Sequence, residues 1–161
     1  NRNLSAESLV DISVLAAEKV RCFGLQPNIA LISFSDFGSD DAESSCEARR
    51  AVALLHERYP DLSVDGEMQI QTALQLAQRD AKYPQNKLKG KQVNVLVFPR
   101  LSAANACYQL LKAVGNADEV VGPIQVGLAR PIYFADHDAS VKDIVNITAM
   151  ASLDSNACIV G

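Results

Sequence analysis

Two continuous apolar runs, "NIALISF" at residues 28–34 and "VNVLVF" at residues 93–98, constrain the fold of this chain most strongly. Polar and apolar residues do not alternate along either run, so both faces of each strand should be covered by other elements. Strands of this kind are typical of parallel sheets that lie between helices. We therefore expect a parallel sheet buried between helical layers.

Helical patterns separate these runs. The first follows Ser5, a favourable N-cap, and stops at Gly24 and Pro27. Helices are expected from Ser5 to Gly24, from residues 38–39 to Pro60, from Gln69 to Arg79, from Ser102 to Gly115 and from Ser140 onward. Further extended segments are expected at residues 62–66, 120–127 and 131–134, with a polar loop at residues 83–91. The alternation of strands and helices predicts an α/β fold, a three-layer α/β/α sandwich.

The length and composition indicate one folded domain. The chain has 161 residues, of which 48% are hydrophobic, which is enough to bury a core. We therefore expect a single domain over residues 1–161. Because the chain begins at Asn1 and not at Met, we expect it to be excised from a longer polypeptide.

The charge pattern and the absence of a long apolar run exclude several classes of partner. The net charge is −4 and no basic run is long enough to follow a nucleic-acid backbone, so no nucleic acid is expected as a partner. No apolar run approaches the ~20 residues of a membrane span, and the first residues do not resemble a signal peptide. We expect no membrane contact and a cytoplasmic location.

The four cysteines, at positions 22, 46, 107 and 158, are widely spaced and form no C-x-x-C pair. This spacing favours free thiols over structural disulfides or a zinc site. No metal site is therefore expected in this chain.

Ligands of open α/β sheets gather at the carboxyl ends of strands, so the loops after the apolar runs are candidate sites. The first loop, "SFSDFGS" at residues 33–39, leads into a helix and could offer backbone N–H groups to an anion. Its candidate ligands are Ser33, Ser35, Gly38 and Ser39. An ordinary acidic helix cap is the alternative, because acidic residues crowd the same helix start: Asp36, Asp40, Asp41 and Glu43.

The second loop places Arg100 just past a strand end and Asn105 in the first turn of the next helix. Arg100 could bind a phosphate, or it could be a solvated surface residue. Asn105 could contact the same ligand, or it could only support Ser102 in the helix cap.

The third loop contains Asp136, His137 and Asp138. This cluster could serve acid–base chemistry, hold a metal, be the altered remains of a different site, or consist of solvated loop residues. Ser140 and Asp143 follow it in an S-x-x-D pattern, which is a helix-capping arrangement before it is anything else.

Five blocks carry a resemblance to a known family: "ALISFSDFGS", "PDLSVDGEMQ", "VNVLVFPRLSAAN", "VVGPIQVGLARP" and "ASVKDIVN". In order and spacing they resemble the phosphotransacetylases, the phosphate acetyl/butyryl transferase family. Those enzymes exchange an acetyl group between acetyl phosphate and coenzyme A, without a metal, in a cleft between two α/β subdomains. The resemblance implies that this chain is the second subdomain of that isocitrate dehydrogenase-like fold and carries its dimerisation surface.

The chain departs from the family pattern where the chemistry should occur. Asp136 and His137 stand where active phosphotransacetylases have a Ser-Arg pair, and only Asp143 keeps the family residue. Phe37 replaces a common lysine, and Arg100 a common acid. A histidine between carboxylates offers phosphate no permanent positive charge, so no catalytic residue is expected here.

A degenerate chain of this kind is similar to the C-terminal domain of the large bacterial NADP-dependent malic enzymes. This resemblance implies a regulatory domain that senses acetyl-CoA and forms a homodimer, within a higher homo-oligomer of the parent enzyme. NADP and a divalent metal would bind the parent outside this chain, and no cofactor would bind this domain. There are two alternatives. The chain could be part of an active phosphate acetyltransferase, or it could be a purely structural dimerisation domain. The expected ligand-binding residues are Ser33, Ser35, Gly38, Ser39, Arg100, Asn105, Arg130 and Ser140.

Overall fold

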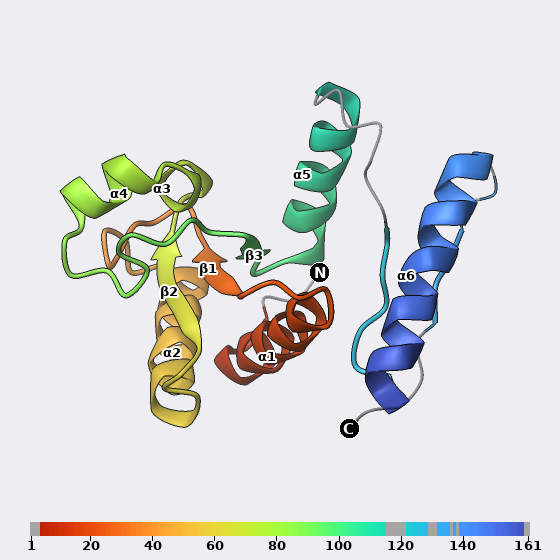
Figure 1. Cartoon of the computed structure of the whole chain (residues 1–161). Helices are drawn as coiled ribbons and strands as arrows, with labels where there is room; N and C mark the ends of the chain where they lie inside the picture. The colour runs from red at the N-terminus through yellow and green to blue at the C-terminus, as the bar shows by residue number, and fades with distance from the viewer. Residues whose placement is uncertain (1–3, 115–121, 129–131, 136, 138, 160–161) are drawn as a thin grey trace.

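The fold is built around a parallel sheet of three strands in the order β2-β1-β3 (Figure 1). The computed structural model describes residues 4–114, 122–128, 132–135, 137 and 139–159. The strands are β1 (Asn28–Ile32), β2 (Ser63–Met68) and β3 (Val95–Val97). The helices are α1 (Ala6–Cys22), α2 (Glu43–Arg58), α3 (Ile70–Leu74), α4 (Leu76–Lys82), α5 (Leu101–Val114) and α6 (Val141–Ile159).

The central strand β1 is covered on both faces, as its apolar sequence predicts. Ile29 and Leu31 pack in one core cluster with residues of α1 and α2. Ala30 and Ile32 belong to a second cluster on the opposite face, formed with α3 and with the segment that precedes β3. The three-layer α/β arrangement is therefore confirmed, with α1 and α2 on one side of the sheet and α3 on the other.

The first helix forms where its capping residue predicts. The Ser5 hydroxyl accepts a hydrogen bond from the Ser8 N–H at 3.3 Å, and Leu9, Val10 and Ala17 are buried against the sheet layer. The helix ends at Cys22, and Gly24 adopts a left-handed conformation with φ of +72°.

Three predicted boundaries are wrong. The helix after β3 begins at Leu101, and the Ala104 N–H donates to the Arg100 carbonyl, so Ser102 lies inside the first turn and is not the N-cap. The apolar run at residues 93–98 forms ladder pairs only over Val95–Val97, although the Asn94 N–H still donates to the Asn28 carbonyl of β1 at 3.1 Å. The helical pattern from Gln69 breaks at Gln75, whose non-helical backbone separates α3 from α4.

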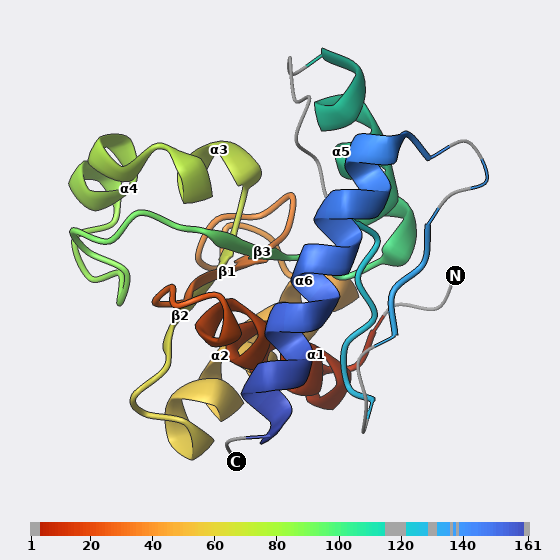
Figure 2. The same cartoon turned by 45° about the vertical axis from the view of Figure 1, so that its right-hand side comes forward.

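The C-terminal part extends beyond the sheet. The segments predicted to be extended at residues 120–127 and 131–134 meet, within the described residues, in one antiparallel bridge between Ile124 and Tyr133. In Figures 1 and 2, α6 lies outside the sheet, on the side of α1.

We define the apolar C-terminal surface as the exposed large apolar side chains of α5, α6 and the segments between them: Leu101, Leu110, Leu111, Val114, Leu128, Ile132, Phe134, Val141, Ile144, Val145 and Leu153. In the described part of the chain, no helix has the length and apolar character needed to cross a membrane.

A buried cluster of polar side chains, which we call the polar joint, connects α6 to α1 and consists of Lys19, Tyr133 and Asp154. Asp154 is 3% exposed, forms an ion pair with Lys19 and accepts a hydrogen bond from the Tyr133 hydroxyl at 2.9 Å. Burial raises the pKa of Tyr133 to about 12, and the hydrogen bond to Asp154 acts in the same direction. Burial opposes ionisation of Asp154, but the hydrogen bonds from Lys19 and Tyr133 outweigh it and hold the pKa of Asp154 below its usual value.

The stabilisation from this joint should therefore be lost at both extremes of pH. A lowered carboxyl pKa gives stability that is present above the ordinary value near ~4 and is lost as pH falls below it. The raised phenol pKa gives stability that is present below the ordinary value near ~10 and is lost as pH rises toward the folded value. Thermal denaturation of the wild type and of Asp154→Asn should differ most near neutral pH. A difference that does not change with pH would contradict this account.

Candidate ligand-binding site

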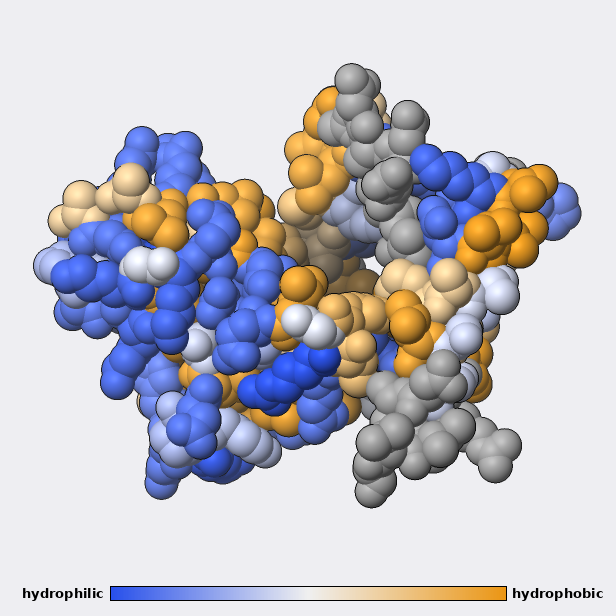
Figure 3. All heavy atoms as spheres, in the orientation of Figure 1, coloured by the Kyte–Doolittle hydropathy of each residue, from blue (hydrophilic) through white to orange (hydrophobic). Residues whose placement is uncertain are grey.

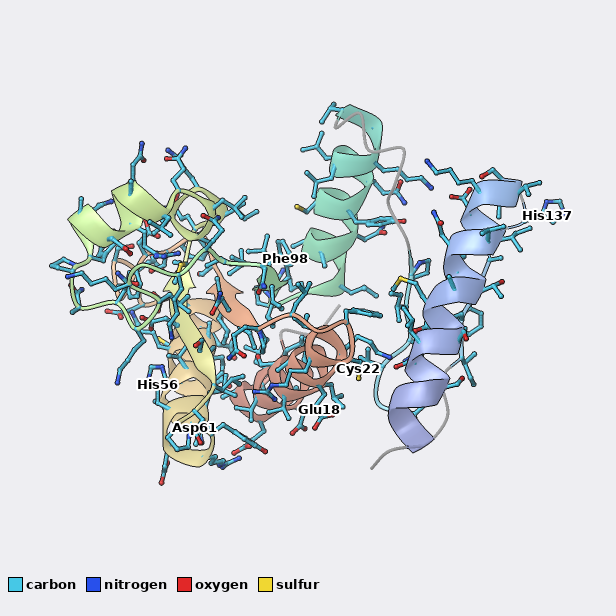
Figure 4. All side chains as sticks on the ribbon, viewed as in Figure 1. Glu18, Cys22, His56, Asp61, Phe98 and His137 are labelled. Carbon is cyan, nitrogen blue, oxygen red and sulfur yellow. The ribbon has the colours of Figure 1, made fainter. Side chains whose placement is uncertain are left out.

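The carboxyl ends of the three strands converge on a cavity of about 710 Å³. Figure 3 shows the molecule hollowed between the sheet and α5, with apolar residues around the hollow, and Figure 4 places Phe98 there. The cavity is lined after the strands by Ile32, Ser33, Phe34, Gln69, Ile70, Gln71, Phe98, Pro99 and Arg100, and from α2 and α5 by Ser44, Ala103 and Cys107. This volume lies in the range of sites for small molecules and cofactors.

The cavity combines an apolar wall with a few polar groups. Phe34, Ile70 and Phe98 supply apolar surface, while Ser33 and Arg100 supply a hydroxyl and a positive charge. Ser33 and Arg100 follow different strands, 67 positions apart in the sequence numbering, yet both line this cavity. An arrangement of this kind can hold an elongated apolar ligand with an anionic group near the arginine.

The loop after β1 is held by hydrogen bonds to Glu67 of β2 and by bonds within the loop. The Ser35 hydroxyl donates to Glu67 Oε1 at 2.7 Å, and the Gly38 N–H donates to the same atom at 2.9 Å. The Ser39 hydroxyl accepts from the Asp36 N–H at 2.9 Å. These three predicted ligand residues lie beside the cavity but do not line it. Their role toward a ligand stays a prediction.

Two acidic residues of this loop, Asp40 and Asp41, lie directly before α2, which begins at Glu43. Asp40 accepts a hydrogen bond from the Ala42 N–H at 2.7 Å, immediately before the helix begins. Asp41 forms an ion pair with Arg49 at 2.8 Å. Neither carboxylate caps α2, since its N-cap residue is Ala42 and no side-chain cap hydrogen bond forms there; the two acids lie in the turn before the helix, where negative charge suits the helix dipole.

Glu67 is the residue of this region that sequence reasoning missed. It is fully buried, although it lies near the end of a strand, next to a loop with three acidic residues. Its Oε1 atom accepts from Ser35 and Gly38 and lies 3.5 Å from the Arg49 guanidinium. The available signal was an acid that directly follows a glycine within a strand, a pattern typical of a bulge.

The third predicted loop is described only in part. Arg130, Asp136 and Asp138 lie outside the described residues. His137 is exposed, and Figure 4 places it beyond the N-terminal end of α6, far from Phe98 and the cavity. Asn105 is exposed on α5 and does not line the cavity.

Ser140 and Asp143 cap α6. Asp143 Oδ2 accepts from the Ser140 N–H at 2.9 Å and from the Ser140 hydroxyl at 2.7 Å, while the Asp143 N–H donates back to that hydroxyl. The hydrogen bonds from Ser140 lower the pKa of Asp143. The reciprocal bonds are those of a capping box, the alternative that the S-x-x-D pattern indicates.

The cysteines and the possible metal ligands can be located in the described part of the chain. Cys22, Cys46 and Cys107 are free thiols. Among the described residues, no group of three or more His, Cys, Asp or Glu side chains could hold a metal ion.

Together, the parallel sheet and the cavity at its strand ends define an α/β domain with a candidate ligand-binding site. Comparison with known protein families identifies the family to which this α/β domain belongs. Residues 1–152 match the profile of the family described as phosphate acetyl/butaryl transferase, and the chain belongs to this family.

Two kinds of protein are similar to this chain. It is 42% identical over 155 residues to the NADP-dependent malic enzyme of Escherichia coli, which covers 96% of this chain and 20% of that protein. It is 41% identical over 155 residues to the phosphate acetyltransferase of Treponema pallidum, which covers 94% of this chain and 46% of that protein. The chain thus spans about a fifth of the malic enzymes and less than half of the acetyltransferases that it matches.

Solved structures show the same fold. The EutD phosphotransacetylase from Staphylococcus aureus superimposes with a TM-score of 0.87 at 30% identity, over 96% of this chain and 48% of that one. A phosphotransacetylase from Streptococcus pyogenes gives a TM-score of 0.86 at 30% identity, over 100% of this chain and 47% of that one. The expected phosphotransacetylase fold is therefore confirmed.

Proposed function

We propose that this chain is the acetyl-CoA-sensing and oligomerisation domain of an NADP-dependent malic enzyme, and that it transfers no acetyl group itself. The parent enzyme would oxidise and decarboxylate malate to pyruvate. Its NADP and divalent metal would bind outside this chain. The observation that carries the proposal is the strand-end cavity with Ser33 and Arg100 on its wall, in a chain 42% identical to part of a malic enzyme.

The chemistry of acetyl-CoA suits this cavity. The ligand has a flexible, largely apolar arm that ends in the thioester, and a phosphorylated nucleotide at the other end. Phe34, Ile70 and Phe98 offer apolar surface to the arm, and Arg100 offers a guanidinium to a phosphate. Binding would regulate the parent only if acetyl-CoA prefers one conformational state of it, and typical coupling free energies are ~1–3 kcal/mol.

A second candidate function has its own support. The identity of 41% to the phosphate acetyltransferase of Treponema pallidum is close to that of the malic enzyme, so the chain could be part of an active acetyltransferase. The protein sequence before Asn1 separates the two candidates. The malic-enzyme proposal requires a dehydrogenase region there, and an acetyltransferase does not.

Replacing Arg100 with alanine should weaken acetyl-CoA binding by about tenfold or more, because a charge-assisted hydrogen bond contributes ~1.5–3 kcal/mol. Calorimetry on the complete protein measures this. Arg50→Ala is the matched control, since the Arg50 side chain is 68% exposed on α2 and does not line the cavity. Unchanged binding by Arg100→Ala would show that another group is the cationic anchor. Absence of any acetyl-CoA binding would leave only a structural role.

We also predict that this chain forms a homodimer through the apolar C-terminal surface. Two neighbouring leucines of α5, Leu110 at 60% and Leu111 at 56% exposed, present apolar area that a self-complementary contact would bury. Sedimentation at micromolar concentration should give a dimer, and Leu110→Glu or Val145→Glu should dissociate it. Leu25→Glu is the control, because Leu25 is also exposed but lies in the turn after α1. A monomeric wild type would contradict the prediction.

A further inference from the structure

A bulge in β2 determines where Glu67 points. Leu31 of β1 pairs with Gly66, but the next residue, Ile32, pairs with Met68, so Glu67 is an extra residue in β2. The bulge also changes the face of the sheet that following residues occupy. Val64 packs in the cluster with α1 and α2, whereas Met68, four residues on, packs in the cluster on the other face. Released from the ladder, the side chain of Glu67 turns to the loop after β1.

That loop presents two consecutive backbone N–H groups to Glu67. The Phe37 N–H donates to the Glu67 carbonyl at 2.7 Å, and the Gly38 N–H donates to its carboxylate at 2.9 Å. Phe37 and Gly38 both have left-handed backbones, with φ of +46° and +88°. Successive N–H groups in such a turn can form a concavity that binds anions; here the Phe37 N–H is taken by the Glu67 carbonyl, and the Gly38 N–H is the backbone group that reaches the carboxylate. The concavity is completed by the Ser35 hydroxyl and the Arg49 guanidinium.

The buried carboxylate is not a residue that packing alone would select. Glu67 Oε2 is buried and has no hydrogen-bond partner among the described residues. A buried acceptor left in that state costs about 1–3 kcal/mol, which the hydrogen bonds at Oε1 must offset. An apolar side chain at position 67 would avoid this cost, so the presence of a glutamate suggests that its carboxylate has a role in holding the loop.

We propose that Glu67 is a positioning residue: its carboxylate occupies the anion-binding concavity of residues 35–38 and thereby fixes the loop that carries Ser33 and Phe34 to the cavity. One consequence concerns the ligand. The N–H groups of residues 35–38 are already bound to Ser33, Ser39 and Glu67, so a phosphate of the ligand binds elsewhere, at Arg100. The effect on acetyl-CoA rests on the proposed function, whereas the effect on the loop does not.

The test removes the carboxylate and then returns it from solution. Glu67→Ala keeps Cβ and deletes the atoms that correspond to one acetate ion. We expect this variant to melt at a lower temperature than the wild type, and sodium acetate to restore part of the loss. Sodium chloride at equal ionic strength should not restore it, and acetate should leave the melting temperature of the wild type unchanged. Failure of acetate to stabilise Glu67→Ala would overturn the proposal.

Glu67→Gln provides a second test of the positioning role, which can be used even if Glu67→Ala does not fold. Its amide oxygen can still accept from Ser35 and Gly38, so the Gly38 N–H should remain protected from hydrogen exchange and acetyl-CoA affinity should stay within about threefold of the wild type. Loss of Gly38 protection in Glu67→Gln would show that the loop needs the negative charge, which would support the positioning role. Unchanged Gly38 protection in Glu67→Leu, which has no acceptor, would show that the loop does not depend on that acceptor and would overturn the proposal. Retained protection in Glu67→Gln and acetate rescue without acetyl-CoA binding by any form would support the positioning role and reject the sensing function.

Discussion

Acetyl transfer between acetyl phosphate and coenzyme A is expected to be absent from the complete protein. The resemblance to the family implies that Asp136 and His137 stand where active members have a Ser-Arg pair. An arginine supplies a permanent, bidentate positive charge to a transferring group, and removal of one such stabilising contact costs about 10²–10³ in rate. A carboxylate in its place adds repulsion. Coenzyme A-dependent turnover of acetyl phosphate should therefore fall far below the ~1–1000 per second of ordinary enzymes.

The same assay needs a positive control and a converse variant. A phosphate acetyltransferase such as the Treponema pallidum relative should turn over under the same conditions. The double variant Asp136→Ser with His137→Arg tests whether the lost pair is the main deficit, and any turnover that it gains would support that reason. Turnover at ordinary enzyme rates by the wild type would instead favour the second candidate, an active acetyltransferase.

The sequence predicts the sheet well because the signals for its strands are local. The run at residues 28–34 is apolar on both faces, and its core, Asn28–Ile32, is the central strand. Ser5 caps α1 as its position predicts. The strand-end rule also leads to Ser33 and Arg100, which do line the same cavity.

Long-range geometry accounts for most of what the sequence does not predict. Glu67 binds Ser35 and Gly38, which are 32 and 29 positions away, and no local pattern indicates that those residues meet. An acid in a strand is expected to face solvent, and only the bulge after Gly66 turns Glu67 inward.

The apolar face of α5 shows a second limit. Its sequence is amphipathic in appearance, but none of its residues is buried in the described structure. A helix pattern predicts that a face will be covered, without indicating whether this chain or another one covers it. The dimer experiment addresses this point, because burial of Leu110 against a second copy would supply the missing cover.

The largest effect on stability is expected at Gly66. A Cβ atom built on this residue would lie 2.7 Å from the Leu31 carbonyl oxygen, a backbone atom that cannot move aside without disturbing the β1–β2 ladder. Its φ of +147° is also unfavourable for any residue with a side chain. Gly66→Ala should therefore cost about 3 kcal/mol or more in the free energy of unfolding, measured by urea denaturation.

Gly90→Ala is a control for the cost of a side chain on a backbone with positive φ, without a close contact. Gly90 also has a positive φ, +72°, but a Cβ atom there would meet nothing within 4 Å. This control should cost only about 1 kcal/mol, the penalty of the left-handed backbone alone. The excess at Gly66 then reports the close approach of β1 and β2 at the bulge together with the less favourable φ of +147°. Equal losses in the two variants would mean that the strands separate easily at this point, and such a flexible bulge could not hold Glu67 against the loop.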